Sequence, residues 1–202
     1  MWVKARFTFP LTKRIWLLTG DPAIGKSTAV SKILLEVRTA GFAPGGVLTR
    51  EIRSHGEREG FQIVDISSDR VDLLASIRGI TGPRLGKYRV NLMALANIGV
   101  AALQHAVTYS DLIAVDEVGP MELLSPDFRR AIHAAVLESK KPAVCAVHRR
   151  YEDPLIEELR KSPDAIEQEI TFENREMLPA EVAKDIIQFL RGKKRESGIK
   201  PG

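Results

Sequence analysis

The feature that most constrains this chain is an eight-residue segment, Gly-Asp-Pro-Ala-Ile-Gly-Lys-Ser, at residues 20–27. It matches the pattern G-x-x-x-x-G-K-[ST], in which glycines allow successive backbone N–H groups to point at phosphate oxygens. The apolar run of residues 14–19 before it is typical of a buried strand, and apolar residues recur after it at helical spacing as far as Val37. The sequence therefore predicts a strand, a phosphate-binding loop and a helix whose positive dipole end faces the phosphates.

The residue types in this loop predict their contacts. Lys26 is expected to reach the β- and γ-phosphates of a nucleotide, and the Ser27 hydroxyl to bind Mg²⁺. The residues expected to contact the nucleotide here are Gly20, Asp21, Pro22, Ala23, Ile24, Gly25, Lys26, Ser27 and Thr28. Many such loops carry a further glycine in place of Ala23. A methyl group is tolerable at that position only if its backbone angles are ordinary.

Downstream of this loop, buried-strand patterns alternate with amphipathic helices. Strands are predicted at residues 112–115, 142–147 and 165–170. Helices are predicted at residues 91–107 with Asn91 as the N-cap, from Pro126, at 154–161 and at 179–191. This alternation predicts an α/β protein with a three-layer P-loop fold and a mainly parallel sheet.

A different period appears between residues 46 and 89. Residues 46–52 and 60–65 alternate apolar with polar side chains, and the polar segment between them suits a hairpin turn. Residues 71–76 add a third strand, so we expect a small antiparallel meander inserted into the parallel architecture. The glycine-rich, basic stretch of residues 78–89 is predicted to be a long loop.

Composition limits the class of protein further. Cys145 is the only cysteine, which favours a reducing, cytoplasmic location and, within its apolar run, a core position. No apolar run approaches the ~20 residues that span a bilayer, so no membrane contact is expected. We assign residues 1–192 to a single domain. Residues 193–202 are interpreted as a flexible basic tail.

An acid pair follows the predicted strand at residues 112–115. A magnesium-binding carboxylate is expected at the end of a buried strand beside the phosphate loop, and Asp116 stands at that place. Glu117 comes next, where a carboxylate can orient and deprotonate an attacking water. A kinase must instead exclude water, so this pair favours hydrolysis. The predicted catalytic residues are Lys26, Asp116 and Glu117, with Ser27 and Asp116 as metal ligands.

Phosphoryl transfer also requires cations that neutralise the charge of the transition state. Lys87 and Arg89, with Arg84, lie in the basic loop, which could close over the phosphates as a lid. His148 and Arg149 follow the strand at residues 142–147, whose end lies on the ligand side of a parallel sheet. For both pairs a plain surface position is an equal alternative.

Seven segments in order, from the phosphate loop to the last helix, resemble one known family. They are GDPAIGKS, GGVLTREIR, REGFQIVD, LGKYRVN, VDEVGPMEL, AVHRR and TFENR. The family is that of the small thermophile-type nucleoside-triphosphatases, whose animal member is called cancer-related nucleoside triphosphatase. VDEVGPMEL is its most specific segment, because a generic phosphate-loop protein has no need of Gly-Pro-Met-Glu after the acids. The family pattern differs in having a glycine at the position of Ala23 and often one near Arg89.

The resemblance implies a function. It implies a Mg²⁺-dependent phosphohydrolase with slow turnover that accepts nucleoside triphosphates of any base: ATP, GTP, CTP, UTP and TTP. It also implies that the nucleotide contacts the loop of residues 20–27 and the segment from Asp116 through Glu117 to Gly119.

Two other functions are compatible with the residues. One is a nucleotide or nucleoside kinase with residues 78–89 as its lid, although Glu117 argues against it and no acceptor-binding signature is evident. The other is a nucleotide-gated switch or an RNA-associated protein that uses the basic tail. Nucleic acid is a disfavoured partner because no basic stretch is interleaved with aromatic residues. A monomer is the favoured oligomeric state.

Overall fold

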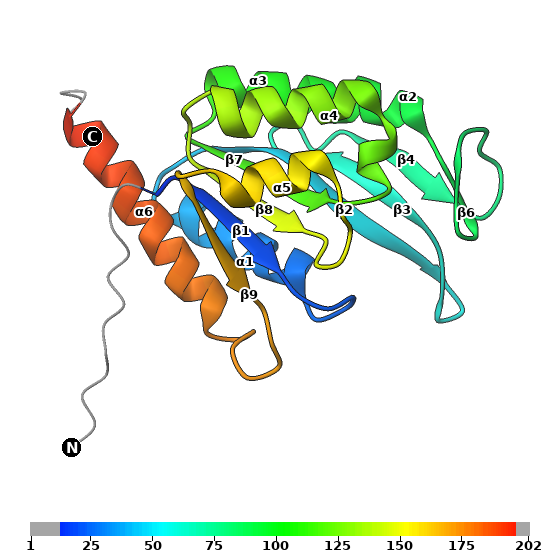
Figure 1. Cartoon of the computed structure of the whole chain (residues 1–202), viewed down its shortest axis with the longest axis horizontal. Coiled ribbons are helices and arrows are strands. Elements are labelled where there is room, and N and C mark those ends of the chain that lie inside the picture. The colour runs from blue at the N-terminus through cyan, green and yellow to red at the C-terminus, as the bar shows by residue number, and fades with distance from the viewer. Residues whose placement is uncertain (1–12, 197–202) are drawn as a thin grey trace.

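The strands of the chain form one mixed sheet in a computed structural model, which describes residues 13–196 (Figure 1). Within this range they are β1 (Ile15–Thr19), β2 (Pro44–Ser54), β3 (Glu57–Asp65), β4 (Val71–Ser76), β5 (Arg84–Leu85), β6 (Tyr88–Val90), β7 (Leu112–Val118), β8 (Ala143–Val147) and β9 (Ala165–Glu169). Their order in the sheet is β5-β6-β4-β3-β2-β7-β8-β1-β9. Along this order, neighbouring strands from β2 through β7, β8 and β1 to β9 are parallel. Neighbouring strands from β2 through β3, β4 and β6 to β5 are antiparallel.

The central parallel strands are buried on both faces. Every residue of β1 and β8 is buried, as expected for parallel strands that lie between two layers of helices. Cys145 lies in β8 and is fully buried, and this burial raises the pKa of its thiol to about 12. The predicted core position of Cys145 is therefore confirmed.

The meander extends this sheet and is not an insertion separate from it. The first residues of β2, Pro44–Val47, pair with β7 in parallel, and the rest of the same strand pairs with β3 in the antiparallel direction. The prediction of a long loop at residues 78–89 is partly wrong. It contains a short hairpin, β5–β6, which pairs with β4 and so widens the sheet. Two- and three-residue strands leave too little periodicity for a sequence pattern to detect.

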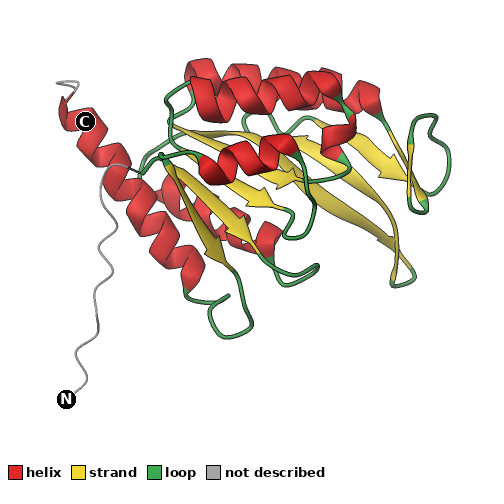
Figure 2. Ribbon diagram, in the orientation of Figure 1, coloured by secondary structure: helices red, strands yellow, loops and turns green. Residues whose placement is uncertain are grey.

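Helices cover both faces of the sheet (Figure 2). One face carries α1 (Lys26–Thr39) and α6 (Leu178–Glu196). The other carries α2 (Leu92–Ala94), the π-helical turn η1 (Leu95–Val100), α3 (Ala101–Tyr109), α4 (Pro126–Ile132), the π-helical turn η3 (His133–Glu138) and α5 (Pro154–Lys161). Each face has its own apolar core. The predicted three-layer α/β fold is thus confirmed.

The elements α2, η1 and α3 form one continuous helix. Its N-cap is Asn91, as predicted, because the Asn91 side chain accepts a hydrogen bond from the Ala94 amide at 3.1 Å. By length and composition alone, Leu92–Tyr109 could span a membrane. Its apolar face, which includes Leu95, Leu103 and Ala106, is instead buried against the sheet. This segment is therefore packed as a core helix.

The last helix runs farther than the sequence predicted. α6 continues through Glu196, so residues 193–196 are helical and do not belong to a flexible tail. Lys193 Nζ donates to the Lys140 carbonyl at 3.0 Å, and Lys194 Nζ lies 4.6 Å from the centre of the Phe42 ring. These contacts hold the basic turn against the body of the protein. Residues 197–202 of the predicted tail lie outside the described residues.

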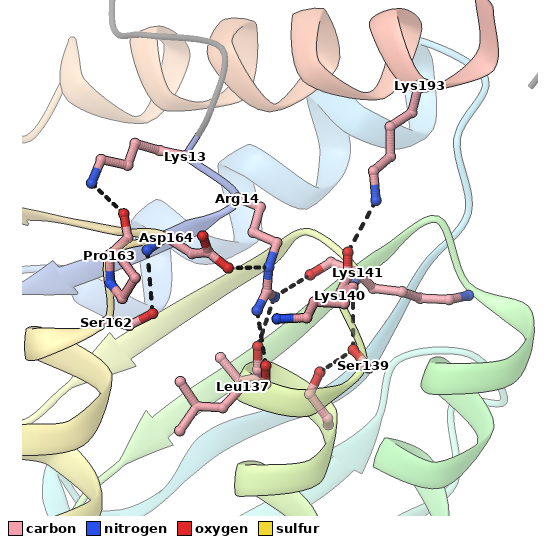
Figure 3. Close-up of polar contacts among 12 residues, drawn as sticks. Lys13, Arg14, Leu137, Ser139, Lys140, Lys141, Ser162, Pro163, Asp164 and Lys193 are labelled. Atoms are coloured by element: carbon pink, nitrogen blue, oxygen red, sulfur yellow. Dashed lines mark hydrogen bonds and ion pairs between the residues drawn. The ribbon is translucent and has the colours of Figure 1, made fainter. Parts of the chain in front are cut away.

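A buried arginine ties the start of β1 to two other parts of the fold (Figure 3). The Arg14 guanidinium donates to the carbonyls of Val136 and Leu137 at the end of η3, at 2.8 and 2.9 Å. It also pairs with the Asp164 carboxylate at 2.8 Å. A cation at a helix C-terminus satisfies carbonyls that have no partner within the helix. This contact orients β1, and β1 in turn positions the phosphate loop.

Candidate nucleotide-binding site

The candidate site lies at the carboxyl edge of the parallel strands, where ligands bind in open α/β sheets. β1 ends at Thr19 and leads into the loop of residues 20–25, from which α1 begins at Lys26. β7 carries the acid pair near its end, and β8 lies between β1 and β7. Because parallel strands end at a common edge, the loop, the acid pair and the residues after β8 converge there.

The loop is built to receive an anion. Gly25 precedes α1 with a φ of 116°, in the region that favours glycine. Among the described residues no side chain caps the start of α1, and its first turn contains no acid. The N–H groups there therefore remain available to phosphate oxygens. Gly20 is needed for a different reason, since a Cβ there would lie 2.8 Å from the Ile170 carbonyl oxygen.

The expectation of ordinary backbone angles at Ala23 is wrong. Ala23 has a φ of 63°, in the left-handed region, where a Cβ approaches the neighbouring carbonyl oxygen. The methyl group is accommodated because Ala23 lines an open cavity. The loop thus keeps the conformation that a glycine would adopt and carries some backbone strain.

We expect Ala23→Gly to stabilise the protein by about 0.5–1 kcal/mol. Relief of left-handed strain contributes ~1–2 kcal/mol, and the greater freedom of glycine in the unfolded chain offsets part of it. Urea unfolding of both proteins measures the difference. The control is Ala134→Gly at an exposed helical position, which is expected to lose about 1 kcal/mol. Equal losses in both variants would show that Ala23 is unstrained.

Lys26 is the first residue of α1, and its side chain extends back to the loop. Its side chain is 8 % exposed, and its Nζ lies 3.3 Å from the Gly20 carbonyl oxygen and 3.5 Å from that of Asp21. The third neighbour is Glu117, whose Oε2 lies 3.9 Å from Nζ. The ammonium group is therefore held between the loop and the acid pair.

The acid pair lies within β7 and not after it, because the strand continues to Val118. Asp116 is 1 % exposed, and its Oδ1 accepts a hydrogen bond from Ser27 Oγ at 3.1 Å. Its Oδ2 is buried and has no hydrogen-bond partner in the described part of the chain. Burial raises the pKa of the Asp116 carboxyl to about 7, with the charge of Glu117 adding to the rise and the Ser27 hydrogen bond opposing it.

These two side chains fit a divalent cation. An orphaned carboxylate oxygen beside a hydroxyl, at the start of a phosphate-binding helix, is the donor set expected for Mg²⁺. Mg²⁺ is usually held by one or two protein ligands, with phosphate oxygens and water completing its coordination. Ser27 and Asp116, the predicted metal ligands, are therefore suitably placed together.

Glu117 faces the open side of the loop. Its side chain is 26 % exposed and lines the same cavity as Lys26. Gly119 does not line this cavity but shapes it. A Cβ on Gly119 would lie 3.4 Å from Glu117 Oε1 and 3.3 Å from Oε2 of Glu122, so a side chain would crowd both carboxyl groups.

Sequence reasoning missed Glu122. It begins the short 3₁₀ turn η2 (Glu122–Leu124), is 6 % exposed and lines the cavity. Burial raises the pKa of its carboxyl to about 8, and the charge of Glu117 adds to the rise. It is therefore protonated at neutral pH. Its place in the family-specific VDEVGPMEL segment was the only sequence signal for it.

Glu122 should make stability depend on pH. Its pKa rises from 4.5 in the unfolded chain to about 8, so the folded state binds more protons between these values. The contribution of Glu122 to the free energy of unfolding is fully present below pH 4.5 and is lost as the pH rises through 8. In metal-free buffer, Glu122→Gln is expected to be more stable than the parent at pH 8 by roughly 2–4 kcal/mol, with no gain near pH 4.5.

Urea unfolding across this pH range measures the effect of Glu122→Gln. The control is Glu36→Gln on α1, whose exposed side chain should leave the pH profile unchanged. A parallel pH profile for Glu122→Gln and the parent would contradict a buried, protonated Glu122.

The loop and the acids open into a cavity of about 990 Å³. Of the predicted nucleotide contacts, Ile24, Asp116 and Gly119 are not among its lining residues, whereas the others are. Ile24 is an apolar core residue beneath the loop.

Of the four predicted charge stabilisers, three line the cavity and one does not. Lys87, His148 and Arg149 line the cavity, whereas Arg89 does not and donates to the Gly82 carbonyl at 3.0 Å. Arg149 pairs with Glu169 at 2.8 Å and with Asp21 in the loop at 3.1 Å. Arg149 therefore lies next to the phosphate loop.

The arrangement of a strand, a glycine-containing loop, a helix, a buried acid and an adjacent carboxylate defines the class of protein. It is a P-loop protein of the nucleoside-triphosphatase type. A sequence profile of the family described as NTPase matches residues 15–183. The chain belongs to this NTPase family, as the resemblance predicted.

Individual relatives agree with this assignment. The chain is 41% identical over 174 residues to nucleoside-triphosphatase THEP1 of Methanosarcina acetivorans, covering 86% of this chain and 97% of that protein. It is 37% identical over 176 residues to the protein of the same name from Thermofilum pendens, covering 87% and 96%.

Two solved structures are also similar. THEP1 from Aquifex aeolicus superposes with a TM-score of 0.74 at 28% identity, over 83% of this chain and 96% of that one. A human cancer-related nucleoside triphosphatase superposes with a TM-score of 0.72 at 28% identity, over 85% of this chain and 96% of that one.

Proposed function

We propose that this nucleoside-triphosphatase is Mg²⁺-dependent and uses Glu117 as the general base that activates water. The observation that carries the proposal is the position of Glu117, with its carboxylate 3.9 Å from Lys26 Nζ in the same cavity. Lys26 belongs beside the γ-phosphate, so a carboxylate next to it is placed where the attacking water must be oriented.

The other residues of the loop bind and orient the triphosphate. The backbone N–H groups of residues 23–28 hold the phosphates, and Lys26 neutralises the oxygens of the γ-phosphate. Ser27 and Asp116 would hold Mg²⁺, which supplies positive charge to the β- and γ-phosphates when bound. Glu122, neutral beside Glu117, adds no second negative charge to the path of the water.

The charge of the transition state requires a further cation. Arg149 and His148 line the cavity after β8, and Lys87 lines it from the β5–β6 turn. Arg149 is the first candidate because it already contacts Asp21 of the loop at 3.1 Å. Arg89, which faces away from the cavity, has no part in this proposal.

We infer broad base specificity, slow turnover, a cytoplasmic location and a monomeric enzyme. The loop contacts phosphates and not bases, so ATP, GTP, CTP, UTP and TTP are all expected substrates. None of the relatives named above is called a kinase, and they give the kinase alternative no support.

Phosphate release from each of these five nucleotides, without any acceptor, tests the proposal. Release is expected with Mg²⁺ and should stop when EDTA removes it. Release from a single nucleotide would contradict broad specificity. Release that requires a nucleoside or nucleotide acceptor, with phosphate transferred to it, would identify a kinase and leave Glu117 without its proposed role.

A further inference from the structure

The cavity extends well beyond the phosphate loop to a wall built by the meander. We call this the far wall; its residues are Arg53 on β2, Arg58 and Phe61 on β3, Lys87 in the β5–β6 turn and Tyr88 on β6. The volume of about 990 Å³ is at the upper end of the ~300–1,000 Å³ typical of ligand pockets. There is room for more than the phosphates of one nucleotide.

A nucleoside triphosphate in the loop points away from the far wall. We place its γ-phosphate beside Lys26 and Glu117, on the β7 side of the loop, and its α- and β-phosphates over the N–H groups of the loop itself, which follows β1. An extended triphosphate therefore runs toward the β9 edge of the sheet. The far wall lies on the other side of β7, and Figure 1 shows β6 and β9 at opposite ends of the sheet. The base of that nucleotide leaves the far wall unfilled.

Two aromatic rings give the far wall its chemical character. The Phe61 and Tyr88 rings lie 5.3 Å apart, edge to face at 66°. Arg58 Cζ lies 5.4 Å from the centre of the Phe61 ring, and Lys87 Nζ lies 5.5 Å from that of Tyr88. Aromatic rings combined with cations form the surface on which nucleobases stack.

The charge of the far wall favours an anionic ligand. Glu51 lines the cavity next to the far wall and pairs with Arg53 at 2.7 Å and with Arg58 at 2.9 Å. Arg58 Nε is buried without a hydrogen-bond partner in this part of the chain. With Lys87, three cations face one carboxylate. The five residues of the far wall include no counterpart of the loop at residues 20–27, so this surplus suits one phosphate group and not three.

We propose that the far wall is a second nucleotide subsite that binds a nucleoside monophosphate while the phosphate loop is occupied. The base stacks on Phe61 and Tyr88, and Arg53 and Lys87 contact the phosphate. The ligand then lies on the Glu117 side of the γ-phosphate, where water enters. It therefore slows hydrolysis, a consequence that rests on the proposed function.

Calorimetric titration of AMP into the protein saturated with ADP and Mg²⁺ tests this subsite directly. One AMP should bind to each ADP-loaded chain. Tyr88→Leu keeps apolar packing but removes the ring, and should weaken AMP binding at least about tenfold, the effect of losing one stacked base. Arg53→Gln should also weaken it, and its half-exposed side chain makes a folding defect unexpected.

Matched controls lie on α3 and α4, outside the cavity. Tyr109→Leu and Arg130→Gln alter side chains that are each 72 % exposed and distant from the cavity lining. Neither should change AMP binding.

Kinetics provide a second measurement. AMP should lower kcat for ATP without raising KM, and Tyr88→Leu should abolish this inhibition while hydrolysis without AMP stays within about twofold of the parent. Formation of ADP from labelled AMP would overturn hydrolysis as the proposed function but would support the second subsite.

Three results would overturn the second subsite. AMP binding that disappears when ADP saturates the protein would place AMP in the phosphate loop. A raised KM for ATP in Tyr88→Leu, without AMP binding to the parent, would place the base of ATP on the far wall. Binding of a decanucleotide RNA but not of AMP would make the far wall a nucleic-acid surface.

Discussion

Replacing Lys26 with alanine is expected to lower kcat/KM for every nucleoside triphosphate by about a thousandfold or more. Lys26 Nζ is nearly buried between the loop carbonyls and Glu117, so its charge acts on the γ-phosphate with little screening by water. Removing it leaves the developing negative charge without its nearest protein cation. The same change should weaken nucleotide binding, because the charge also attracts the ground-state phosphates.

Steady-state phosphate release and calorimetric binding measure the two effects of Lys26→Ala. The matched control is Lys32→Ala, on the same helix but exposed and paired with Glu176 at 2.7 Å. Lys32→Ala should retain parental activity. Thermal unfolding should show that both variants are folded. A Lys26→Ala protein with more than about a tenth of parental activity would exclude the proposed γ-phosphate contact.

Replacing Glu117 with glutamine is expected to lower kcat by roughly 10²–10⁴-fold and to preserve nucleotide binding. The amide has the shape of the carboxyl group but does not accept the proton of the attacking water. It also removes a negative charge that lies close to Lys26 and Glu122, so KM should stay the same or fall. This split between kcat and KM distinguishes a base from a residue that only binds substrate.

Single-turnover hydrolysis at saturating ATP, together with ADP binding, measures the effect of Glu117→Gln. Glu36→Gln, which changes an exposed side chain on α1, serves as the control and should leave both turnover and ADP binding unchanged. A Glu117→Gln variant that keeps most of its turnover would show that another group activates the water. Glu122, the other carboxyl group at the cavity, would then be examined next.

Contiguous residues made the phosphate loop and the acid pair predictable. Residues 20–27 match a pattern of glycines, lysine and serine within one short segment, so the residue types themselves carry the information. The acids that follow residues 112–115 were readable for a similar reason, because a continuous apolar run marks a strand that is buried on both faces. The three-layer fold followed from the alternation of such runs with amphipathic helices.

Features that depend on distant pairing were not predictable. No local pattern shows that β2 pairs with β7 over its first residues and with β3 over the rest, because the partner on each edge of β2 is set by the strand order of the folded sheet. Glu122 also looks like an ordinary acid in the sequence. Its raised pKa comes from burial beside Glu117, and burial is a property of the folded chain. The left-handed conformation of Ala23 is likewise imposed by the loop as a whole.

By itself, the sequence determined the loop of residues 20–27, the acid pair at Asp116 and Glu117, and the three layers of the fold. Each of these depends on interactions between neighbouring residues or on the period of apolar side chains. Only the tertiary structure decided which basic residues reach the cavity. It directs Arg149 and Lys87 into it and Arg89 away, and it brings Phe61 and Tyr88 together from separate strands. Distances between residues remote in the chain are set by strand order and register, which no local pattern encodes.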